Sequence, residues 1–277
     1  MSRPYSLSYL TYLDLAPPHA VEVASKAGYD YLGLRLLPAV KGGVCHPLMD
    51  NPQMLAETLA IMRGTGVEVF DLEMIRLQAD FNVEDYRSFF EIGQKLGARA
   101  VLIAGDDEDR SRLIDSFAQV CEAAQPYRIS AQLEFMPQTN VRNIKDAITV
   151  LEKSGGNNCG IIFDSLHFAR SGSTLDDLKS IPREWLAYAQ ICDGPEIGPD
   201  TIEGLNYAAR HERLLPGDGE LDLRQWFSLI PANIPISVEV PNDKQAPEYG
   251  ALNWSRKALA MSKAILGDEA AKGTALS

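Results

Sequence analysis

The sequence predicts an α/β protein with a single domain, folded as a closed (β/α)8 TIM barrel. Short apolar segments alternate with longer amphipathic segments along nearly the whole chain of 277 residues. Eight such pairs follow one another, and no Ser/Gly-rich linker divides them. Eight strand–helix units in roughly 250 residues are typical of a closed barrel. The alternative is a doubly wound open sheet, but no GxGxxG motif follows the first predicted strand.

The predicted strands are short apolar runs flanked by Gly, Pro or charged residues, as buried parallel strands usually are. In chain order they span residues 7–13, 31–35, 67–75, 100–104, 130–135, 160–164, 188–192 and 235–240. The predicted helices have apolar residues at helical spacing, and several have Pro in the first turn or Gly after the last. They span residues 17–28, 51–66, 83–97, 108–124, 140–156, 173–181, 221–230 and 248–267.

The predicted domain covers residues 1–267. The remaining residues, 268–277, are small and polar, which is typical of a frayed tail. In a barrel of this type the active site forms at the C-terminal ends of the strands. The polar residues at those ends are therefore the candidates for function.

The composition excludes some classes of binding partner. The net charge is −12, and such a surface repels polyphosphate, so neither nucleic acid nor an anionic membrane is an expected partner. The four cysteines are widely spaced without a CxxC motif, which indicates reduced thiols. No apolar run approaches the ~18 residues of a membrane span. We therefore expect a cytoplasmic protein that binds a small molecule; barrels of this kind often pair, so a homo-oligomer stays open.

Four consecutive predicted strands each carry a side chain with an oxygen ligand atom at or near the C-terminal end. The fifth strand ends with Glu134, the sixth with Asp164, the seventh carries Gln190 and the eighth carries Glu239. A single carboxylate at a strand end is more often a helix cap or a surface charge. Four such groups on strands ~4.8 Å apart can converge, and crowded carboxylates repel one another unless a cation lies between them. Oxygen ligands suit Mg²⁺ or Mn²⁺, so a metal site is predicted.

A second polar group lies on the predicted strands 2 and 3. Arg35 closes one strand, and Glu73 lies near the end of the next. An arginine at this face suits a carboxylate or phosphate on the substrate. The alternative is an internal Arg–Glu pair that orients the metal ligands. Both residues are therefore candidates for substrate binding.

The strand-end motifs resemble those of the xylose isomerase-like TIM-barrel superfamily, which contains sugar phosphate isomerases and epimerases. The similar segments are "LEF" (133–135), "FDSLHFARSG" (163–172), "AQICDGP" (189–195), "RLLPGDGELD" (213–222) and "ISVEVP" (236–241). The resemblance covers nearly the whole chain and is specific for fold and metal site, but weak for substrate. Members of the superfamily include ketose 3-epimerases, hydroxypyruvate isomerases, inosose dehydratases, 3-dehydroshikimate dehydratases and endonuclease IV.

The resemblance implies roles for individual residues. Glu134 and Glu239 correspond to the acid/base pair of the epimerases, and His167 corresponds to a histidine that contacts substrate or moves a proton. Arg213 resembles a substrate-orienting arginine. The implied cofactor is one divalent ion, Mn²⁺ or Mg²⁺, with Co²⁺ or Zn²⁺ as alternatives. Gln190 stands where epimerases usually have histidine, and together with the "ARHER" segment it resembles some bacterial 3-dehydroshikimate dehydratases.

The expected function is that of a metal-dependent isomerase or epimerase of carbohydrate metabolism. It would act on a small sugar or polyhydroxy ketone through a metal-stabilised enediolate. The alternative is a metal-dependent dehydratase, a lyase of the 3-dehydroshikimate or inosose type. A non-catalytic binding barrel is less favoured, because the full ligand set is present. DNA cleavage is not expected from a chain with four histidines and a net charge of −12.

Overall fold

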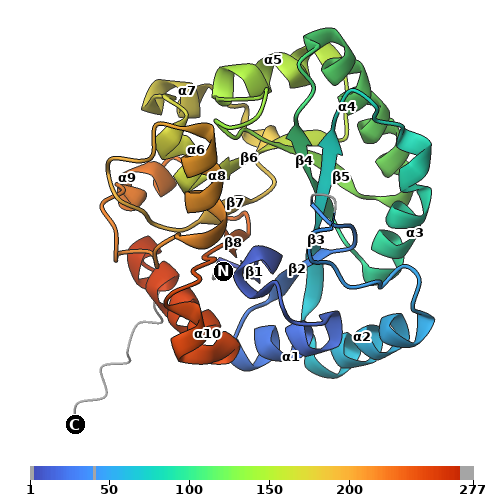
Figure 1. The fold of residues 1–277 in the computed structure, drawn as a ribbon, viewed down its shortest axis with the longest axis vertical. Helices are drawn as coiled ribbons and strands as arrows, with labels where there is room; N and C mark the ends of the chain where they lie inside the picture. Colours follow the sequence, from blue (N-terminus) through green and yellow to red (C-terminus); the bar gives the residue numbers. More distant parts are fainter. Residues whose placement is uncertain (1–2, 40–41, 269–277) are drawn as a thin grey trace.

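The computed structural model describes residues 3–39 and 42–268. In this part of the chain eight parallel strands form a closed barrel in the order β1 to β8, and helices surround it (Figure 1). Each strand pairs with the next in sequence, and β8 pairs with β1. The predicted fold class is therefore confirmed. Most of the predicted tail lies outside the described residues; Asp268 accepts a hydrogen bond of 2.6 Å from the Tyr5 hydroxyl.

The strands are short, and most of their residues are buried. They are β1 (Tyr5–Leu7), β2 (Tyr31–Arg35), β3 (Glu68–Leu77), β4 (Ala100–Gly105), β5 (Ser130–Glu134), β6 (Cys159–Asp164), β7 (Ala189–Ile191) and β8 (Ile236–Val238). The predicted second strand, 31–35, agrees with β2, and the predicted strands three to eight overlap the observed ones with shifts of at most two residues at either end.

The helices connect the strands on the outside of the barrel. They are α1 (Pro17–Ala27), α2 (Pro52–Thr65), α3 (Arg87–Leu96), α4 (Arg110–Ala124), α5 (Ile144–Ser154), α6 (Ser165–Arg170), α7 (Leu175–Ser180), α8 (Ile202–His211), α9 (Leu223–Phe227) and α10 (Ala246–Leu266). Short 3-10 helices are η1 (Tyr9–Tyr12), η2 (Val83–Tyr86), η3 (Gln125–Tyr127) and η4 (Arg183–Trp185).

The first predicted strand, 7–13, is wrong. The strand β1 ends at Leu7, and the residues after Ser8 form η1. The apolar residues of this segment are buried because η1 packs Tyr9 and Tyr12 against the core, not because the strand continues. Ending the strand early leaves the Ser8 side chain at the mouth of the barrel, where it contacts the candidate site.

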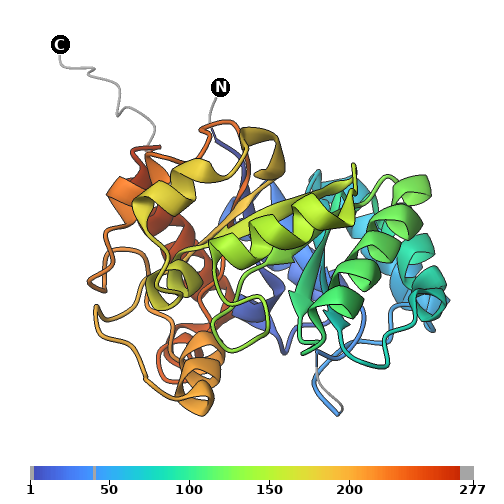
Figure 2. The ribbon, with the colours of Figure 1, turned by 90° about the horizontal axis from the view of Figure 1, so that it is seen from above.

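Two helices, α6 and α8, were not predicted. Helix α6 has only six residues and begins at the cap formed by Asp164, whose side chain accepts a hydrogen bond from the His167 backbone N–H. Helix α8 has a single buried residue, Ala209, so it lacks the apolar stripe by which a helix is recognised in a sequence. In Figure 2, α8 lies on the side of the barrel opposite to the end of α10.

Among the described residues, a small apolar cluster is separate from the main core. The cluster consists of Phe70, Ala100, Leu102, Ile162 and Tyr188. At Gly160 a Cβ atom would lie 2.3 Å from the Trp185 carbonyl oxygen and 2.4 Å from Gln132 Oε1. At Gly33 it would lie 3.1 Å from the Asp71 carboxylate. Glycine at these positions makes room for polar side chains inside the barrel, below the candidate site.

None of the helices in the described part of the chain has the length and apolar character needed to cross a membrane.

Candidate active site and metal centre

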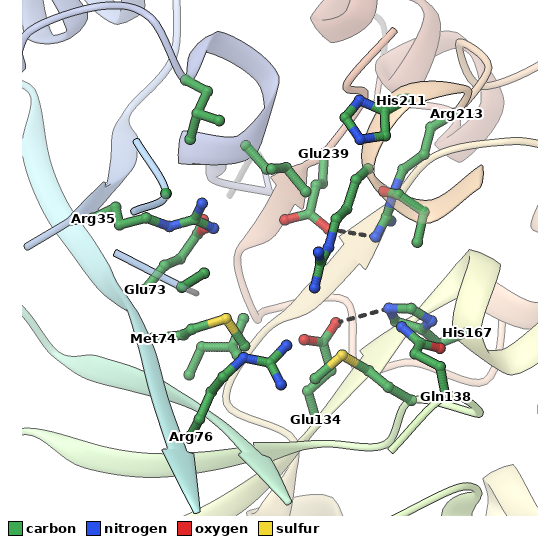
Figure 3. Close-up of a pocket in the computed structure, with 18 of the residues that line it drawn as sticks. Arg35, Glu73, Met74, Arg76, Glu134, Gln138, His167, His211, Arg213 and Glu239 are labelled. Carbon is green, nitrogen blue, oxygen red and sulfur yellow. Dashed lines mark hydrogen bonds and ion pairs between the residues drawn. The ribbon is translucent and has the colours of Figure 1, made fainter. Parts of the chain in front are cut away.

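The four predicted ligands converge at the C-terminal ends of β5 to β8. Asp164 and Gln190 are direct Cα partners on β6 and β7, Glu134 is the last residue of β5, and Glu239 follows β8. All four side chains are buried. Glu134 and Glu239 line a cavity of about 220 Å³. Figure 3 shows their two carboxylates directed toward each other across this cavity.

Unpaired oxygen atoms indicate that this group of side chains fits a cation. Glu134 Oε1 and Gln190 Oε1 are buried and have no hydrogen-bond partner among the described residues. Gln190 Nε2 donates to Glu239 Oε1 at 2.9 Å, so the amide presents its oxygen as a free acceptor. Glu134, Asp164 and His167 each offer a ligand atom, and these atoms lie within 4.8 Å of one another. Buried oxygens without donors are costly, and a divalent ion would satisfy them.

Arg213 bridges two of the candidate ligands. Its Nη1 donates to Asp164 Oδ2 at 2.6 Å, and its Nη2 lies 2.8 Å from Glu239 Oε2. Arg213 is 2% exposed, so its charge is offset almost entirely by these carboxylates. The sequence resemblance implied a substrate-orienting arginine. The described contacts of its guanidinium are with protein groups, so its direct effect is to hold Asp164 and Glu239 in place, although it also lines the cavity.

The crowding of charge shifts several pKa values. Burial raises the pKa of Glu134 well above its ordinary value, and the carboxylates of Asp164 and Glu239 raise it further. Burial also raises the pKa of Glu239 to about 7, although the Arg213 guanidinium opposes this shift. Burial acts in the same direction on Asp164, but Arg213 and His167 outweigh it and hold the pKa of Asp164 below its ordinary value. A bound cation would relieve this repulsion.

His167 lies beside Glu134. Its Nε2 is 3.7 Å from Glu134 Oε1 (Figure 3), and its backbone N–H donates to Asp164 Oδ1 at 2.8 Å. Burial lowers the pKa of His167 to about 4, so the imidazole is neutral at pH 7. A neutral imidazole at a cavity wall can either accept a proton or donate its N–H.

Arg35 and Glu73 form an internal ion pair at the edge of the same cavity. Arg35 Nη2 donates to Glu73 Oε2 at 2.8 Å. The Ser8 hydroxyl lies 3.1 Å from Glu73 Oε1 and 2.7 Å from Glu239 Oε1, and so connects this pair to the ligand set. Of the two alternatives from the sequence, the structure contains the Arg–Glu pair. Direct contact of these residues with a substrate stays a prediction.

Sequence reasoning missed three side chains that shape the site. Asp71 is buried inside the barrel, and its Oδ1 has no partner among the described residues. Arg210, on α8, lines the cavity. Asp193, two residues after β7, accepts backbone hydrogen bonds from the segment that follows Arg213. The "CDG" and "PGDG" motifs were a signal for Asp193, and the "ARHER" segment contains Arg210, although the position of Arg210 depends on a helix that the sequence did not predict.

Comparison with known proteins places this chain in a family. The family model described as xylose isomerase-like TIM barrel matches residues 21–265. An inosose isomerase of Bacillus velezensis is 23% identical over 249 residues, which cover 83% of this chain and 83% of that protein. A 3-dehydroshikimate dehydratase of Pseudomonas aeruginosa is 26% identical over 171 residues, which cover 58% of this chain and 26% of that protein. Both of these relatives are enzymes.

The fold is shared with a crystal structure described as IOLI protein with a bound zinc atom. The TM-score is 0.78 and the identity is 19%, with 98% of this chain and 100% of that chain covered. The family model spans most of the described barrel, including every candidate ligand. The chain therefore belongs to the xylose isomerase-like TIM barrel family.

Proposed function

We propose that the protein is a metal-dependent isomerase or epimerase of a small hydroxy-ketone. One observation carries the proposal: Glu134 Oε1 and Gln190 Oε1 are buried without a partner among the described residues, beside the carboxylates of Asp164 and Glu239. Such buried oxygens are costly unless a bound group such as a divalent ion satisfies them. The relative with the more complete coverage, an inosose isomerase, supports the isomerase class. The reduced cysteines and the acidic composition favour a cytoplasmic enzyme without a nucleic-acid partner.

The proposed metal ligands are Glu134, Asp164, Gln190 and Glu239. Three carboxylates and one amide oxygen favour Mn²⁺ or Mg²⁺, and the zinc atom in the structure of similar fold supports a divalent ion more generally. When bound, the ion supplies a Lewis acid that stabilises negative charge developing on the substrate oxygens. Arg213 and Gln190 hold the carboxylates in position through the contacts described above.

The proton transfers are assigned to residues on different sides of the cavity. Glu134 takes a proton from the carbon next to the substrate carbonyl, and Glu239 returns one on the other face, which gives an epimer. Return of the proton to the neighbouring carbon gives an aldose–ketose isomer instead. His167 is neutral at pH 7 and lies 3.7 Å from Glu134, so it can hydrogen-bond to a substrate hydroxyl or pass on its proton.

Dehydration is the second candidate reaction. Gln190 in place of histidine favours it, as does the similarity of part of the chain to a 3-dehydroshikimate dehydratase. In this case Glu134 removes the proton as before and passes it to the neutral imidazole of His167, which gives its other ring proton to the hydroxyl group that leaves from the next carbon as water. The two reactions therefore share the proton abstraction and differ in their second step.

The metal is tested first. Protein stripped with EDTA is titrated separately with Mn²⁺, Mg²⁺, Co²⁺ and Zn²⁺, and the bound ion is measured by calorimetry and elemental analysis. We expect one ion per chain, and the Glu239→Gln variant should weaken binding at least roughly tenfold. Glu91→Gln, at an exposed position of α3, is the matched control and should bind as the wild type does. Equal affinity in the wild type and Glu239→Gln would contradict the ligand assignment.

The reaction is tested with the metal-loaded enzyme in D₂O. We expect deuterium to enter the carbon next to the carbonyl of an inosose or another ketose, measured by NMR, and activity to fall with the metal content. The same enzyme is incubated with 3-dehydroshikimate, where an aromatic chromophore would reveal dehydration. Aromatisation without exchange in any ketose would replace the isomerase by the dehydratase.

A further inference from the structure

Two of the four cysteines lie next to each other at the N-terminal end of the barrel strands, opposite to the candidate site. Cys121 is in the last turn of α4 and is 3% exposed, whereas Cys159 is the first residue of β6 and is half-buried. A Cβ atom at Gly156 would lie 3.1 Å from Cys121 Sγ and 3.6 Å from Cys159 Sγ, so both sulfurs reach the same point. Glycine at this position leaves the space that the two sulfurs share.

The backbone holds the two cysteines in this arrangement. Asn158 Nδ2 donates to the Ile129 carbonyl at 2.6 Å and lies 3.5 Å from the Cys121 carbonyl oxygen. The Asn158 carbonyl accepts a hydrogen bond of 2.9 Å from the Ala131 backbone N–H. The residue before Cys159 is therefore tied both to the end of α4 and to β5. A disulfide forms only between cysteines whose backbones are held close together, and these contacts hold them so.

The two thiols form a short chain of hydrogen bonds. The Cys159 thiol donates to the Gly156 carbonyl at 3.1 Å. The Cys121 thiol donates to the Cys159 sulfur, and this bond together with burial raises the pKa of Cys121. The same bond lowers the pKa of Cys159, although burial opposes the shift. Cys159 is therefore both the more exposed and the more easily ionised thiol, and the thiolate is the form that reacts with an oxidant.

The other two cysteines have different surroundings. Cys192 is buried beside the candidate site, where Arg213 Nη1 lies 3.3 Å and Ser165 Oγ 3.6 Å from its sulfur. Burial raises the pKa of Cys192 to about 12, which makes it a poor nucleophile at pH 7. Cys45 lies in the segment between β2 and α2, away from the end of α4. Proximity and ionisation therefore both favour reaction within the pair of Cys121 and Cys159.

We propose that Cys121 and Cys159 are a redox pair, which a peroxide converts to an intramolecular disulfide that braces the N-terminal end of the barrel. The Cys159 thiolate attacks the O–O bond, which breaks and gives a sulfenic acid on Cys159 and one water. The Cys121 sulfur then attacks the Cys159 sulfur, the S–O bond breaks, and the hydroxyl leaves with the Cys121 proton as a second water. Two thiols thus lose two electrons and two protons to one hydrogen peroxide. A dithiol reductant reverses the reaction by exchange.

The disulfide would close a loop that contains β5 and α5. Joining the two ends of such a loop restricts the unfolded chain, so the folded barrel becomes more stable relative to it. The proposed metal ligands lie at the other end of the strands, since the length of β6, roughly 16 Å, separates Cys159 from Asp164. The bond therefore acts on stability, away from the proposed metal site, and does not depend on the proposed function.

The test counts free thiols in the purified wild-type protein before and after treatment with hydrogen peroxide. We expect the four thiols to fall to two, peptide mapping to identify the Cys121–Cys159 bond, and dithiothreitol to restore all four. The oxidised protein should melt at least about 3 °C higher than the reduced protein. Cys45→Ser is the matched control and should form the same bond. In Cys121→Ser a sulfenic acid should remain on Cys159 and react with dimedone.

Every other outcome counts against the redox pair. Persistence of all four thiols, a bond that includes Cys45 or Cys192, a bond between two chains, or a sulfinic acid on Cys159 in place of the disulfide would show that the two thiols are only packed together. An oxidised protein that melts at the same or a lower temperature would overturn the bracing role. Peptide mapping of the wild type decides the bond even where Cys121→Ser fails to fold.

Discussion

At the scale of single residues, Asp71 is the side chain whose environment is hardest to reconcile with a charged carboxylate. It lies inside the barrel, one inward position before Glu73 on β3, and is 1% exposed. Burial raises its pKa well above the ordinary value, and the carboxylates of Glu73 and Glu239 raise it further. The folded protein therefore holds the Asp71 proton more tightly than the unfolded chain does. Its contribution to stability is fully present below the unfolded pKa of ~3.9 and is lost as pH rises through the folded pKa.

The first prediction at this scale concerns Asp71→Asn. The amide has a similar shape and cannot ionise, so the variant should be more stable than the wild type at pH 8, by about 1–3 kcal/mol. The difference should shrink toward pH 4, where the unfolded wild-type chain is also protonated. Urea unfolding at pH 4.5 and 8 measures both values. Asp115→Asn, at an exposed position of α4, controls for general charge effects. A less stable Asp71→Asn at pH 8 would show that the ionised carboxylate has a partner in the fold.

At the scale of elements, Asp193 organises the segment that connects β7 to α9. Its carboxylate accepts hydrogen bonds from the backbone N–H groups of Gly194 at 2.8 Å, Gly217 at 2.8 Å and Leu221 at 3.1 Å. A Cβ atom at Gly219 would lie 2.3 Å from Asp193 Oδ1 and 2.5 Å from the Gly194 carbonyl oxygen. The "PGDGE" segment therefore closes around one buried carboxylate, and Arg213 lies just before this segment.

We therefore expect Asp193→Asn to act on both stability and catalysis. Replacing one carboxylate oxygen by an NH₂ group sets two donors against each other at Gly217 and should cost about 1.5–3 kcal/mol. Displacement of the segment should also shift Arg213 and the carboxylates of Asp164 and Glu239 that it holds, which should lower kcat more than it raises KM. Urea unfolding and steady-state kinetics measure the two effects. Asp200→Asn, at an exposed position between β7 and α8, is the control. Unchanged stability in Asp193→Asn would contradict the organising role.

The sequence predicted secondary structure correctly where the spacing of apolar residues matches the pattern of burial in the fold. Strand positions followed from short apolar runs, and the residues at the ends of β5 to β8 identified Glu134, Asp164, Gln190 and Glu239 as one group. The segment after Ser8 was misread because its apolar run is short, and such a run does not distinguish a strand from a short helix such as η1. Helix α8 was missed because it has almost no buried face, and with it Arg210. Pairings such as Arg213 with Asp164 depend on side-chain directions, which no local pattern determines.

At the scale of the whole molecule, the ligand set links four strands of the closed barrel, so metal binding should stabilise all of it. Mn²⁺ at about 100 times its dissociation constant should add roughly 2.7 kcal/mol to the free energy of unfolding. For a chain of this size the melting temperature should rise by roughly 5–10 °C. Calorimetric melting with and without Mn²⁺ measures the shift. A rise of the same size in Glu239→Gln would show that the ion stabilises the protein from elsewhere.

The bond between Ser8 and Glu239 joins positions 231 residues apart in the chain, at the point where β1 meets β8. During synthesis on the ribosome the first of these residues emerges long before the second. At ~5–20 residues per second, β1 waits roughly 10–50 s for the strand that completes its pairing. In that interval the unpaired edge of β1 can pair with strands of other nascent chains. A chaperone bound to the chain at this stage would prevent such pairing. The group of Glu134, Asp164, Gln190 and Glu239 is therefore complete only after the eighth strand has emerged.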